Sequence, residues 1–584
     1  MGDPAVGVVG SEMLFPSRPS GARAAVDGRG TEIVLALRLY ERRCGGSTAP
    51  AAHHSTWSGG GLADCLWGHR QHGSDLAGNP ARVWVDDPRR RQGGHVESCG
   101  QAAQSCAAGP LEDSEPGKPG TEAWAITVQP QAGEVAGYTD PASVKAGEQV
   151  ALFVSSTAAT VTATAYRIGG YTGGRGRQIW QGTLTTGGVQ PPAEVSGSTR
   201  TVLAAWQPSI RISTAAWPAG FYLIKLVAAT GGQWQVPFVV RSDSSAGRVA
   251  LVLPLTTWQA YNDWGGLSLY HGPGGRSDFS GRSYAVSFDR PYPSPGAGEF
   301  LYSALPMVAA AERDGVPLAY LANTDLQSDP QALTAARGYV SVGHDEYWTP
   351  LMRQRVTAAR DSGTNLLITG ANTMDWRVRL QPGLRNTGPD RLVVGYKNAQ
   401  LDPQAGQDPI GATAHFADPP APDSQQSLIG TRYECFPADT SWTVTTPSWW
   451  GFDGSDLKPG EAFAHLLAVE ADRVYPGTGT PRPMQIIADA AYTCRGRPTT
   501  AQAIYYTAPS GAGVVNLDSL RWTCALDPGC RDGNLTARTN QFVTVVTKNV
   551  LRAFSQGPLG PRFPVADNLD SFTLPSTHTV YPDN

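Results

Sequence analysis

Several polar side chains that could do chemistry follow short apolar runs of the sequence. His344 and Glu346 follow "GYVSV", Tyr261 follows "RVALVLPL", Asn372 follows "NLLITG", and Glu470 lies at the close of "LLAVE". An imidazole, a phenol, an amide and two carboxylates are the residue types that transfer protons and orient a substrate. If the apolar runs are strands of one sheet, their ends converge, and these five side chains face one crevice.

The elements that would position them alternate between strand and helix from residue 248 onward. Continuous apolar runs such as "NLLITGA" are typical of strands that are covered on both faces, and "FLYSALPMVAAAERDG" carries a helical period. A second helix is expected after Thr349 as the cap, with Pro350 at its first position and Gly363 as its stop. This alternation predicts a doubly wound, mostly parallel α/β sheet, flavodoxin- or amidotransferase-like, whose ligands bind at the carboxyl ends of the strands.

We expect this α/β domain over residues 248–555, with a β-rich, Trp-rich insertion at about 375–465 and a C-terminal tail at 556–584. Before it, residues 121–244 contain six short strand-like segments separated by Gly and Pro turns. These predict an antiparallel, Ig-like β-sandwich. The segments cover residues 123–130, 149–156, 160–171, 177–184, 221–229 and 234–242.

Residues 1–120 differ from the rest in composition. The stretch "DDPRRRQGGHVESCGQ" is rich in Gly and Arg and has no sustained period of 2 or 3.6. Such a segment buries too little apolar area to offset its chain entropy, so we expect it to be disordered. A translation start placed too far upstream is the alternative, and it would hide an export signal.

Cysteines bear on the compartment. Cys524 and Cys530 lie close together in "TCALDPGC", and Cys435 and Cys494 fall in the same half of the chain. One or two disulfides are expected from these four residues, which favours a secreted or cell-surface protein. The first residues show neither a basic start nor an uninterrupted apolar stretch, so a cytoplasmic location is the alternative.

Charge and motifs point to a small partner. The chain has 46 basic and 50 acidic residues, a formal net charge of −4, and no block of like charge, which argues against nucleic acid or an anionic membrane as the partner. No run of about 18 apolar residues is present to span a bilayer. A zinc spacing, a G-x-G-x-x-G after the first strand and a G-x-S-x-G elbow are also missing from the sequence, which disfavours structural zinc, a dinucleotide site and a serine hydrolase.

Five segments occur in an order that resembles a known family. They are "TTWQAYNDWGG", "RSYAVSFDRPY", "GHDEYW", "GANTMDWRVR" and "VEADR", and the resemblance covers roughly residues 125–555. The sequence is similar to the large (β) subunit of N,N-dimethylformamidase and its uncharacterised bacterial relatives. That enzyme hydrolyses an amide at a mononuclear ferric iron (Fe3+), so the resemblance implies a small-molecule amide as substrate. It also implies a small companion subunit, or a homo-oligomer.

The resemblance further implies which residues act. The iron ligands fall on Glu346, on Tyr261 and on a second tyrosine, for which Tyr284 is chosen while Tyr270 and Tyr302 stay open. Two phenolates and a carboxylate are hard oxygen donors that match a hard trivalent cation. The catalytic glutamate falls on Glu470, and the accompanying histidine and asparagine fall on His344 and Asn372.

Two other functions remain open from the sequence. Glu346 and Glu470 could be the acid and base of a metal-independent glycoside hydrolase, with Trp258, Trp264 and Trp348 stacking on sugars. The chain could also be a noncatalytic secreted protein that binds a glycan or peptide. Iron analysis separates the first alternative from the amidase, and binding by Glu346→Ala tests the second.

Overall fold

The computed structural model describes residues 114–276, 279–385, 387–458, 460–477, 479–530 and 532–574. The expectation of disorder over 1–120 therefore falls almost wholly outside the described residues. So does the end of the predicted tail.

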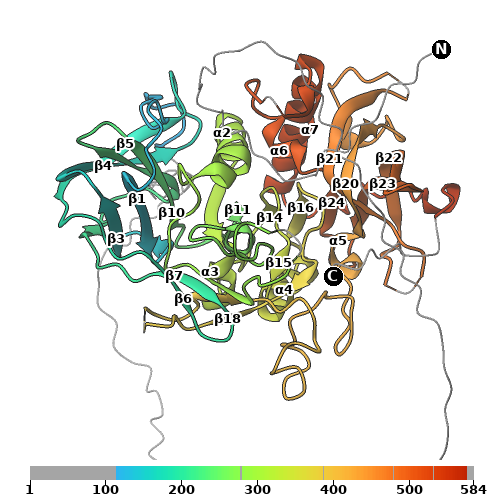
Figure 1. Ribbon diagram of the computed structural model, residues 1–584. Coiled ribbons are helices and arrows are strands. Elements are labelled where there is room, and N and C mark those ends of the chain that lie inside the picture. Colours follow the sequence, from blue (N-terminus) through green and yellow to red (C-terminus); the bar gives the residue numbers. More distant parts are fainter. Residues whose placement is uncertain are drawn as a thin grey trace, which may run out of the picture. The chain divides into compact units, whose positions relative to one another are not determined.

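A seven-stranded, largely parallel sheet forms the centre of the C-terminal part (Figure 1). In spatial order its strands are β13 (Leu318–Ala322), β11 (Val249–Leu253), β14 (Gly338–Ser341), β16 (Asn365–Ile368), β24 (Gly513–Asn516), β23 (Arg497–Thr507) and β22 (Met484–Cys494). The first five are parallel to one another, and the pairs β24–β23 and β23–β22 are antiparallel, so β23 is the strand that runs in the opposite direction. The expectation of a mostly parallel sheet is confirmed.

The order of the strands also tells where a ligand would bind. The chain enters the sheet at β11, adds β13 on one side and then β14 on the other side. The winding therefore reverses between β11 and β14. In open α/β sheets the crevice outside the carboxyl ends at such a reversal is the usual ligand site.

Helices cover both faces of this sheet (Figure 1). Leu251 of β11 shares a core with Met307 of one helix and Val546 of another. Its neighbour Val252 points to the opposite face and shares a second core with Met352 and other residues. Because successive strand residues face opposite sides, strands covered on both sides are apolar at every position. The helices and single turns that pack on or beside the sheet are α1 (Leu255–Tyr261), η2 (Phe300–Ala304), α2 (Leu305–Arg313), α3 (Asn323–Ser328), α4 (Pro350–Asp361), α5 (Gln426–Ile429), α6 (Arg521–Cys524) and α7 (Ala537–Ser555).

Helix α4 begins and ends where its sequence predicts. Thr349 is the N-cap, and its hydroxyl accepts a hydrogen bond from the backbone N–H of Met352. Pro350 is the first helical residue, where its missing N–H costs nothing. Gly363 follows the helix with a φ of +101°, a conformation that favours glycine.

Residues 135–241 form two sheets that enclose a core of their own. One sheet contains β1 (Val135–Asp140), β3 (Gln149–Ser156) and β8 (Ile210–Ser213), and the other contains β2 (Ser143–Lys145), β10 (Gln233–Arg241), β9 (Gly220–Ala228), β4 (Thr160–Ile168) and β5 (Gly176–Thr185). Leu152, Ile224 and Phe238 are among the fully enclosed core residues. The pairs are antiparallel except β2 with β10, which run parallel. The expected antiparallel sheets are thus present with one parallel exception.

One expected strand of this region is wrong. Residues 123–130 form no strand, because side chains rather than a ladder satisfy the segment's backbone. Lys225 Nζ donates to the carbonyls of Ala123 and Ala125 at 3.0 and 2.6 Å, and the Gln233 side chain accepts from the N–H of Thr127 at 2.9 Å.

The remaining strands form small sheets. They are β6 (Ala193–Ser196) with β7 (Thr201–Ala204); β12 (Ala285–Ser287) with β19 (Leu392–Val394) and β18 (Arg379–Gln381); β15 (Tyr347–Trp348) with β17 (Trp376–Arg377); and β20 (Arg432–Thr443) with β21 (Ala462–Arg473). The short helical turns are η3 (Trp450–Phe452), η4 (Asp532–Asn534) and η5 (Leu569–Ser571).

Two disulfides are present, where one or two were expected without a stated pairing. Cys435 of β20 is bonded to Cys494 at the end of β22, and Cys524 is bonded to Cys530. Two disulfides in this half of the chain are compatible with an extracellular protein. Within the described residues, no helix combines the length and apolar character that crossing a bilayer requires.

Candidate functional site

Helix α1 fixes the first tyrosine against the loop that follows β14. Thr257 and Tyr261 lie four residues apart, so they share one face of the helix. The hydroxyl of Thr257 accepts hydrogen bonds from the backbone N–H groups of Glu346 and Tyr347 at 3.0 and 3.2 Å. One turn further along, the Tyr261 hydroxyl donates to Glu346 Oε2 at 2.7 Å. The helix thus holds the backbone of the loop and contacts its carboxylate from the same face.

A second tyrosine completes this oxygen cluster. The Tyr270 hydroxyl lies 3.1 Å from both carboxylate oxygens of Glu346 and 2.8 Å from the Tyr261 hydroxyl. The two rings stack with centroids 4.5 Å apart. Tyr347 donates to the Tyr270 hydroxyl at 2.5 Å. Two phenols and one carboxylate therefore converge within hydrogen-bonding distance of one another.

Tyr284, the sequence-based choice for the second tyrosine, is not part of this cluster. Its ring stacks on Tyr396 and packs against the guanidinium groups of Arg200 and Arg282. The physical reason is the irregular path of the segment between α1 and β12, which turns Tyr270 toward Glu346 and Tyr284 toward the two arginines.

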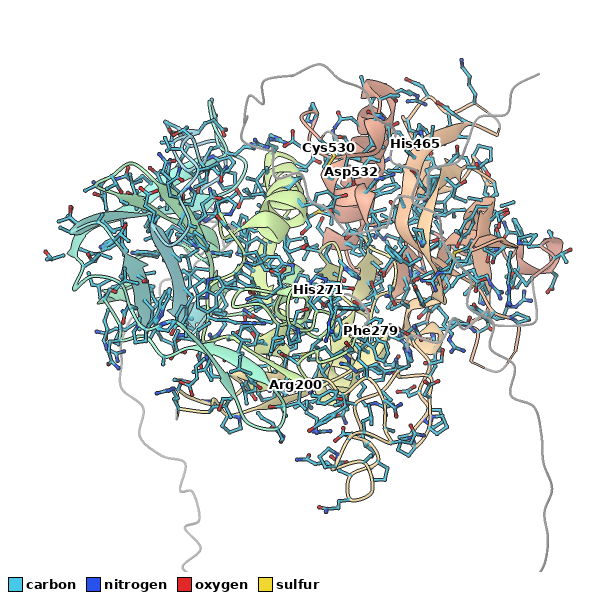
Figure 2. All side chains as sticks on the ribbon, viewed as in Figure 1. Arg200, His271, Phe279, His465, Cys530 and Asp532 are labelled. Carbon is cyan, nitrogen blue, oxygen red and sulfur yellow. A yellow bond between two sulfur atoms is a disulfide. The ribbon has the colours of Figure 1, made fainter. Side chains whose placement is uncertain are left out.

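Tyr302, the other alternative, also lies elsewhere, because its hydroxyl donates to Asp532 at 2.6 Å. Figure 2 labels Asp532 apart from His271 and Phe279, two residues of the segment that follows Tyr270. Of the three tyrosines considered as the second ligand, the structure brings only Tyr270 to Glu346.

His344, Asn372 and Glu470 adjoin the oxygen cluster. Asn372 Nδ2 donates to Glu346 Oε1 at 3.1 Å and to Glu470 Oε1 at 3.2 Å, so the amide bridges the two carboxylates. His344 Nε2 lies 3.0 Å from Glu470 Oε2 and 3.5 Å from Glu346 Oε2. The five side chains expected to face one crevice do meet.

Three buried polar atoms of this group are left without a well-directed hydrogen bond. They are His344 Nε2, Asn372 Oδ1 and Glu470 Oε2. His344 Nε2 and Glu470 Oε2 are close enough for an ion pair, but their angles are not those of a hydrogen bond. Buried polar atoms are rarely left unsatisfied, so such atoms in one place are typical of a site that receives a ligand.

Glu470 reaches the site from an element that the sequence did not suggest. It was expected at the end of a strand of the central sheet, but it lies inside β21, which pairs with β20 in a separate two-stranded sheet. Arg473, three residues further along β21, is buried and pairs with Glu434 at 2.9 Å rather than with Glu470. The Glu470 carboxylate is therefore available to His344 and Asn372.

Burial and charge set the protonation of the cluster. Burial, reinforced by the charge of Glu346, holds the pKa values of Tyr261 and Tyr270 well above the usual phenol range. Burial also raises the pKa of Glu346 to about 7. Burial alone would lower the pKa of His344, but the charge of Glu470 and that of other nearby acids outweigh it and raise this pKa to about 9. The cluster as it stands thus favours protonated phenols beside a cationic imidazole.

Lys397 is a contributor that the sequence gave no signal for. Its ammonium lies 3.3 Å from the centroid of the Tyr270 ring and 4.6 Å from that of Trp376. Its positive charge also lowers the pKa of Glu346. Tyr347 was missed as well, although it stands inside the quoted "GHDEYW" and could have been found there as a third phenol.

The donor set suits a hard cation. Among the described residues there is no group of three or more His, Cys, Asp or Glu side chains that could hold a metal ion. A ligand set at this site would therefore draw on the phenol oxygens of Tyr261 and Tyr270 together with Glu346. Oxygen donors of this kind match hard cations, and the three unsatisfied atoms beside them are polar groups that a water molecule or substrate could contact.

Two of the three tryptophans of the glycosidase alternative are buried, while Trp264 is half-buried with its ring edge-on to Trp206. Trp348 is 1% exposed and donates its indole N–H to the Asp345 carbonyl, and Trp258 is 3% exposed and packs on Tyr292. Asp345 itself is buried, accepts from Ser341 at 2.9 Å and supports the loop. Within "GHDEYW", Asp345 is therefore the residue that stabilises the loop and does not join the oxygen cluster.

Residues 162–533 match the model of the family described as "N,N-dimethylformamidase beta subunit-like, C-terminal". The match covers well over half of the 584 residues and contains every residue of the site. The chain belongs to this family. The resemblance inferred from the five segments is thereby confirmed.

Other comparisons add little. No curated protein matches the chain. Among solved structures, a Paenibacillus sp. cycloisomaltooligosaccharide glucanotransferase complexed with cycloisomaltoheptaose matches at 12% identity and a TM-score of 0.14. The match covers 46% of this chain and 35% of that enzyme, so it spans about a third of the enzyme's length. A likeness this weak carries no argument about fold or function.

Proposed function

We propose that this member of the N,N-dimethylformamidase β-subunit-like family is an iron-dependent hydrolase of the C–N bond of a small amide. The observation that carries the proposal is the convergence of Tyr261, Tyr270 and Glu346. Their oxygens lie 2.7 to 3.1 Å apart beside His344 and Glu470.

Tyr261, Tyr270 and Glu346 are the residues that would hold a ferric ion (Fe3+). Tyr270 replaces Tyr284 in the set first expected. Loss of the two phenol protons and of the Glu346 proton would supply three negative charges, which balance a trivalent cation. Bound there, the ion would acidify a water molecule and polarise the amide carbonyl.

The chain's own side chains would move the protons. Glu470 takes a proton from the attacking water and returns it to the departing amine nitrogen. His344, 3.0 Å from Glu470, steadies the carboxylate in its charged form. Asn372 spans Glu346 and Glu470 and orients both carboxylates, and its buried Oδ1 has no hydrogen-bond partner. No covalent intermediate is required.

A companion subunit belongs to the same proposal, because the family is named for a β subunit. The proposed substrate class is a small amide. The family match gives no dimensions of a pocket, so it does not single out dimethylformamide within this class. A secreted location is proposed from the two disulfides.

The test is iron content together with the visible spectrum of the full-length protein. Phenolate bound to ferric iron absorbs visible light by charge transfer, so the purified protein should be coloured and contain about one iron per chain. Tyr261→Phe and Tyr270→Phe should each weaken and shift this absorption, because each removes one of the two phenolates. Tyr284→Phe, whose ring packs on Tyr396 outside the cluster, is the matched control and should keep it.

Hydrolysis of short amides then tests the reaction. Glu470→Gln should retain iron and colour but lose about 10²–10⁴-fold in kcat. A colourless protein that stays free of iron after supplementation would overturn the metal assignment. A weakened absorption in Tyr284→Phe instead of in Tyr270→Phe would overturn the ligand set.

A further inference from the structure

A fully buried aspartate lies behind the proposed site. Asp472 follows Glu470 by two residues on β21, so both side chains leave the strand on the same face. Its Oδ1 accepts a hydrogen bond from the backbone N–H of Asn372 at 2.7 Å, and its Oδ2 accepts from the Thr431 hydroxyl at 3.2 Å. It contacts the main chain of a site residue without touching the oxygen cluster itself.

The backbone that Asp472 holds is in an uncommon conformation. Asn372 has a φ of +55°, in the left-handed region that residues other than glycine adopt rarely and at some cost. This conformation aims Nδ2 between Glu346 and Glu470, at 3.1 and 3.2 Å. Strained residues persist only where their surroundings fix them, and the hydrogen bond to Asp472 is such a constraint.

Asp472 is itself anchored to the central sheet. Its N–H donates to Asp518 Oδ1 at 2.6 Å, just after β24. Thr431 is held in turn by Asn516, whose Nδ2 donates to the Thr431 hydroxyl at 2.8 Å, and the Asp518 N–H donates to Asn516 Oδ1 at 3.1 Å. This chain of hydrogen bonds ties the hairpin that carries Glu470 to the strand ends that carry Asn372.

We infer that Asp472 is a positioning residue, which locks Asn372 in its left-handed conformation so that the amide bridges Glu346 and Glu470. The inference rests on the proposed function for its catalytic consequence. Its structural consequence is that the backbone N–H of Asn372 is protected from hydrogen exchange. This protection can be measured in metal-free protein. The constraint needs an acceptor oxygen at this place and not a negative charge, because a neutral carbonyl oxygen accepts the same hydrogen bond.

Hydrogen exchange of residues 369–376 in the metal-free full-length chain tests the structural part. Asp472→Ala should raise the exchange rate of this segment by about tenfold, as expected for the loss of a buried hydrogen bond. Asp472→Asn, which keeps an acceptor oxygen, should restore it to within about threefold. If Asp472→Ala does not fold, Asp472→Leu fills the volume without an acceptor and takes its place.

The matched control is Asp325→Ala. Asp325 is also buried and accepts a backbone hydrogen bond, from Ala322 at 2.8 Å, but lies on α3. It should leave exchange at 369–376 unchanged.

Kinetics on short amides test the catalytic part. Asp472→Ala should lower kcat as Asn372→Ala does, with KM and iron content little changed, and the double variant should be no slower than Asn372→Ala alone. Unchanged exchange in Asp472→Ala, or fully additive losses in the double variant, would overturn the inference. If the wild-type chain hydrolyses no amide, the proposed function fails while the exchange result still decides whether Asp472 holds Asn372.

Discussion

At the scale of single residues, the site concentrates acids that prefer to be protonated. Burial raises the pKa of Glu346 to about 7, of Asp345 to about 6 and of Asp472 to about 7. His344 has its pKa raised to about 9 by the acids around it. Each of these groups holds its proton more tightly in the folded chain than in the unfolded chain.

The metal-free protein should therefore lose stability as the pH rises. A group with a raised folded pKa stabilises the fold fully below its unfolded pKa, and this contribution is lost as the pH passes the folded pKa. For Glu346 the window runs from about 4.5 to about 7, and for His344 from about 6.5 to about 9. We expect the free energy of unfolding to fall by on the order of a few kcal/mol between pH 5 and pH 9.

Denaturant unfolding of the metal-free chain across this range measures the effect. Glu346→Gln cannot ionise, so its slope between pH 5 and 7 should be shallower than that of the wild type. Asp345 and Asp472 have shifts of the same sign and would leave part of the slope. Identical slopes in the two proteins would argue against a raised pKa at Glu346.

At the scale of elements, α1 connects the strand it follows to the loop after β14. Thr257 accepts from two backbone N–H groups of that loop, and Tyr261 contacts Glu346 from the same helical face. The geometry of the site therefore depends on the position and rotation of one short helix, α1. Because α1 is only two turns long, its position comes from these tertiary contacts more than from helix propensity.

Replacing Thr257 should disturb fold and metal binding together. Thr257→Val keeps the volume but leaves the N–H groups of Glu346 and Tyr347 without their acceptor. We expect the free energy of unfolding to fall by about 1–3 kcal/mol and iron affinity to weaken. Thermal unfolding and iron titration measure the two effects. Thr357→Val, at a half-exposed position of α4, is the control and should change neither.

At the scale of the whole molecule, disulfides and buried ion pairs join elements that are distant in the sequence. Arg167 of β4 and Glu312 of α2 form an ion pair at 2.8 Å, with side chains 0% and 1% exposed, which links the N-terminal sheets to the central sheet's helices. The disulfide between Cys435 and Cys494 links β20 to β22 across 59 residues. It fixes one end of the hairpin that delivers Glu470.

The two disulfides should differ in their effect on stability. In the chain-entropy description, a cross-link stabilises more when it closes a longer loop. Replacing Cys435 and Cys494 by serine should lower the free energy of unfolding by about 4 kcal/mol, and replacing Cys524 and Cys530, which are 6 residues apart, by about 2 kcal/mol. Denaturant unfolding compares the two double variants, and the reverse order would contradict the prediction.

The sequence by itself predicted the central strands, helix α4 with its cap, the presence of one or two disulfides, and the placement of Tyr261, His344, Glu346 and Asn372 after strands. Periodicity, capping residues and strand ends are local properties, so neighbouring residues are enough to read them. The strand predicted over residues 123–130 was wrong, because the backbone there is hydrogen-bonded by side chains distant in the sequence and not by a neighbouring strand.

Only the tertiary structure showed that Tyr270 and not Tyr284 lies beside Glu346, placed Glu470 on a hairpin outside the central sheet, and brought Lys397 and Asp472 to the site. Each of these residues comes from an irregular segment or from a separate sheet. Their positions depend on the path of the chain and on contacts across roughly a hundred residues or more, such as Asn372 with Asp472 and Tyr270 with Lys397. No periodic pattern in the sequence encodes such a path.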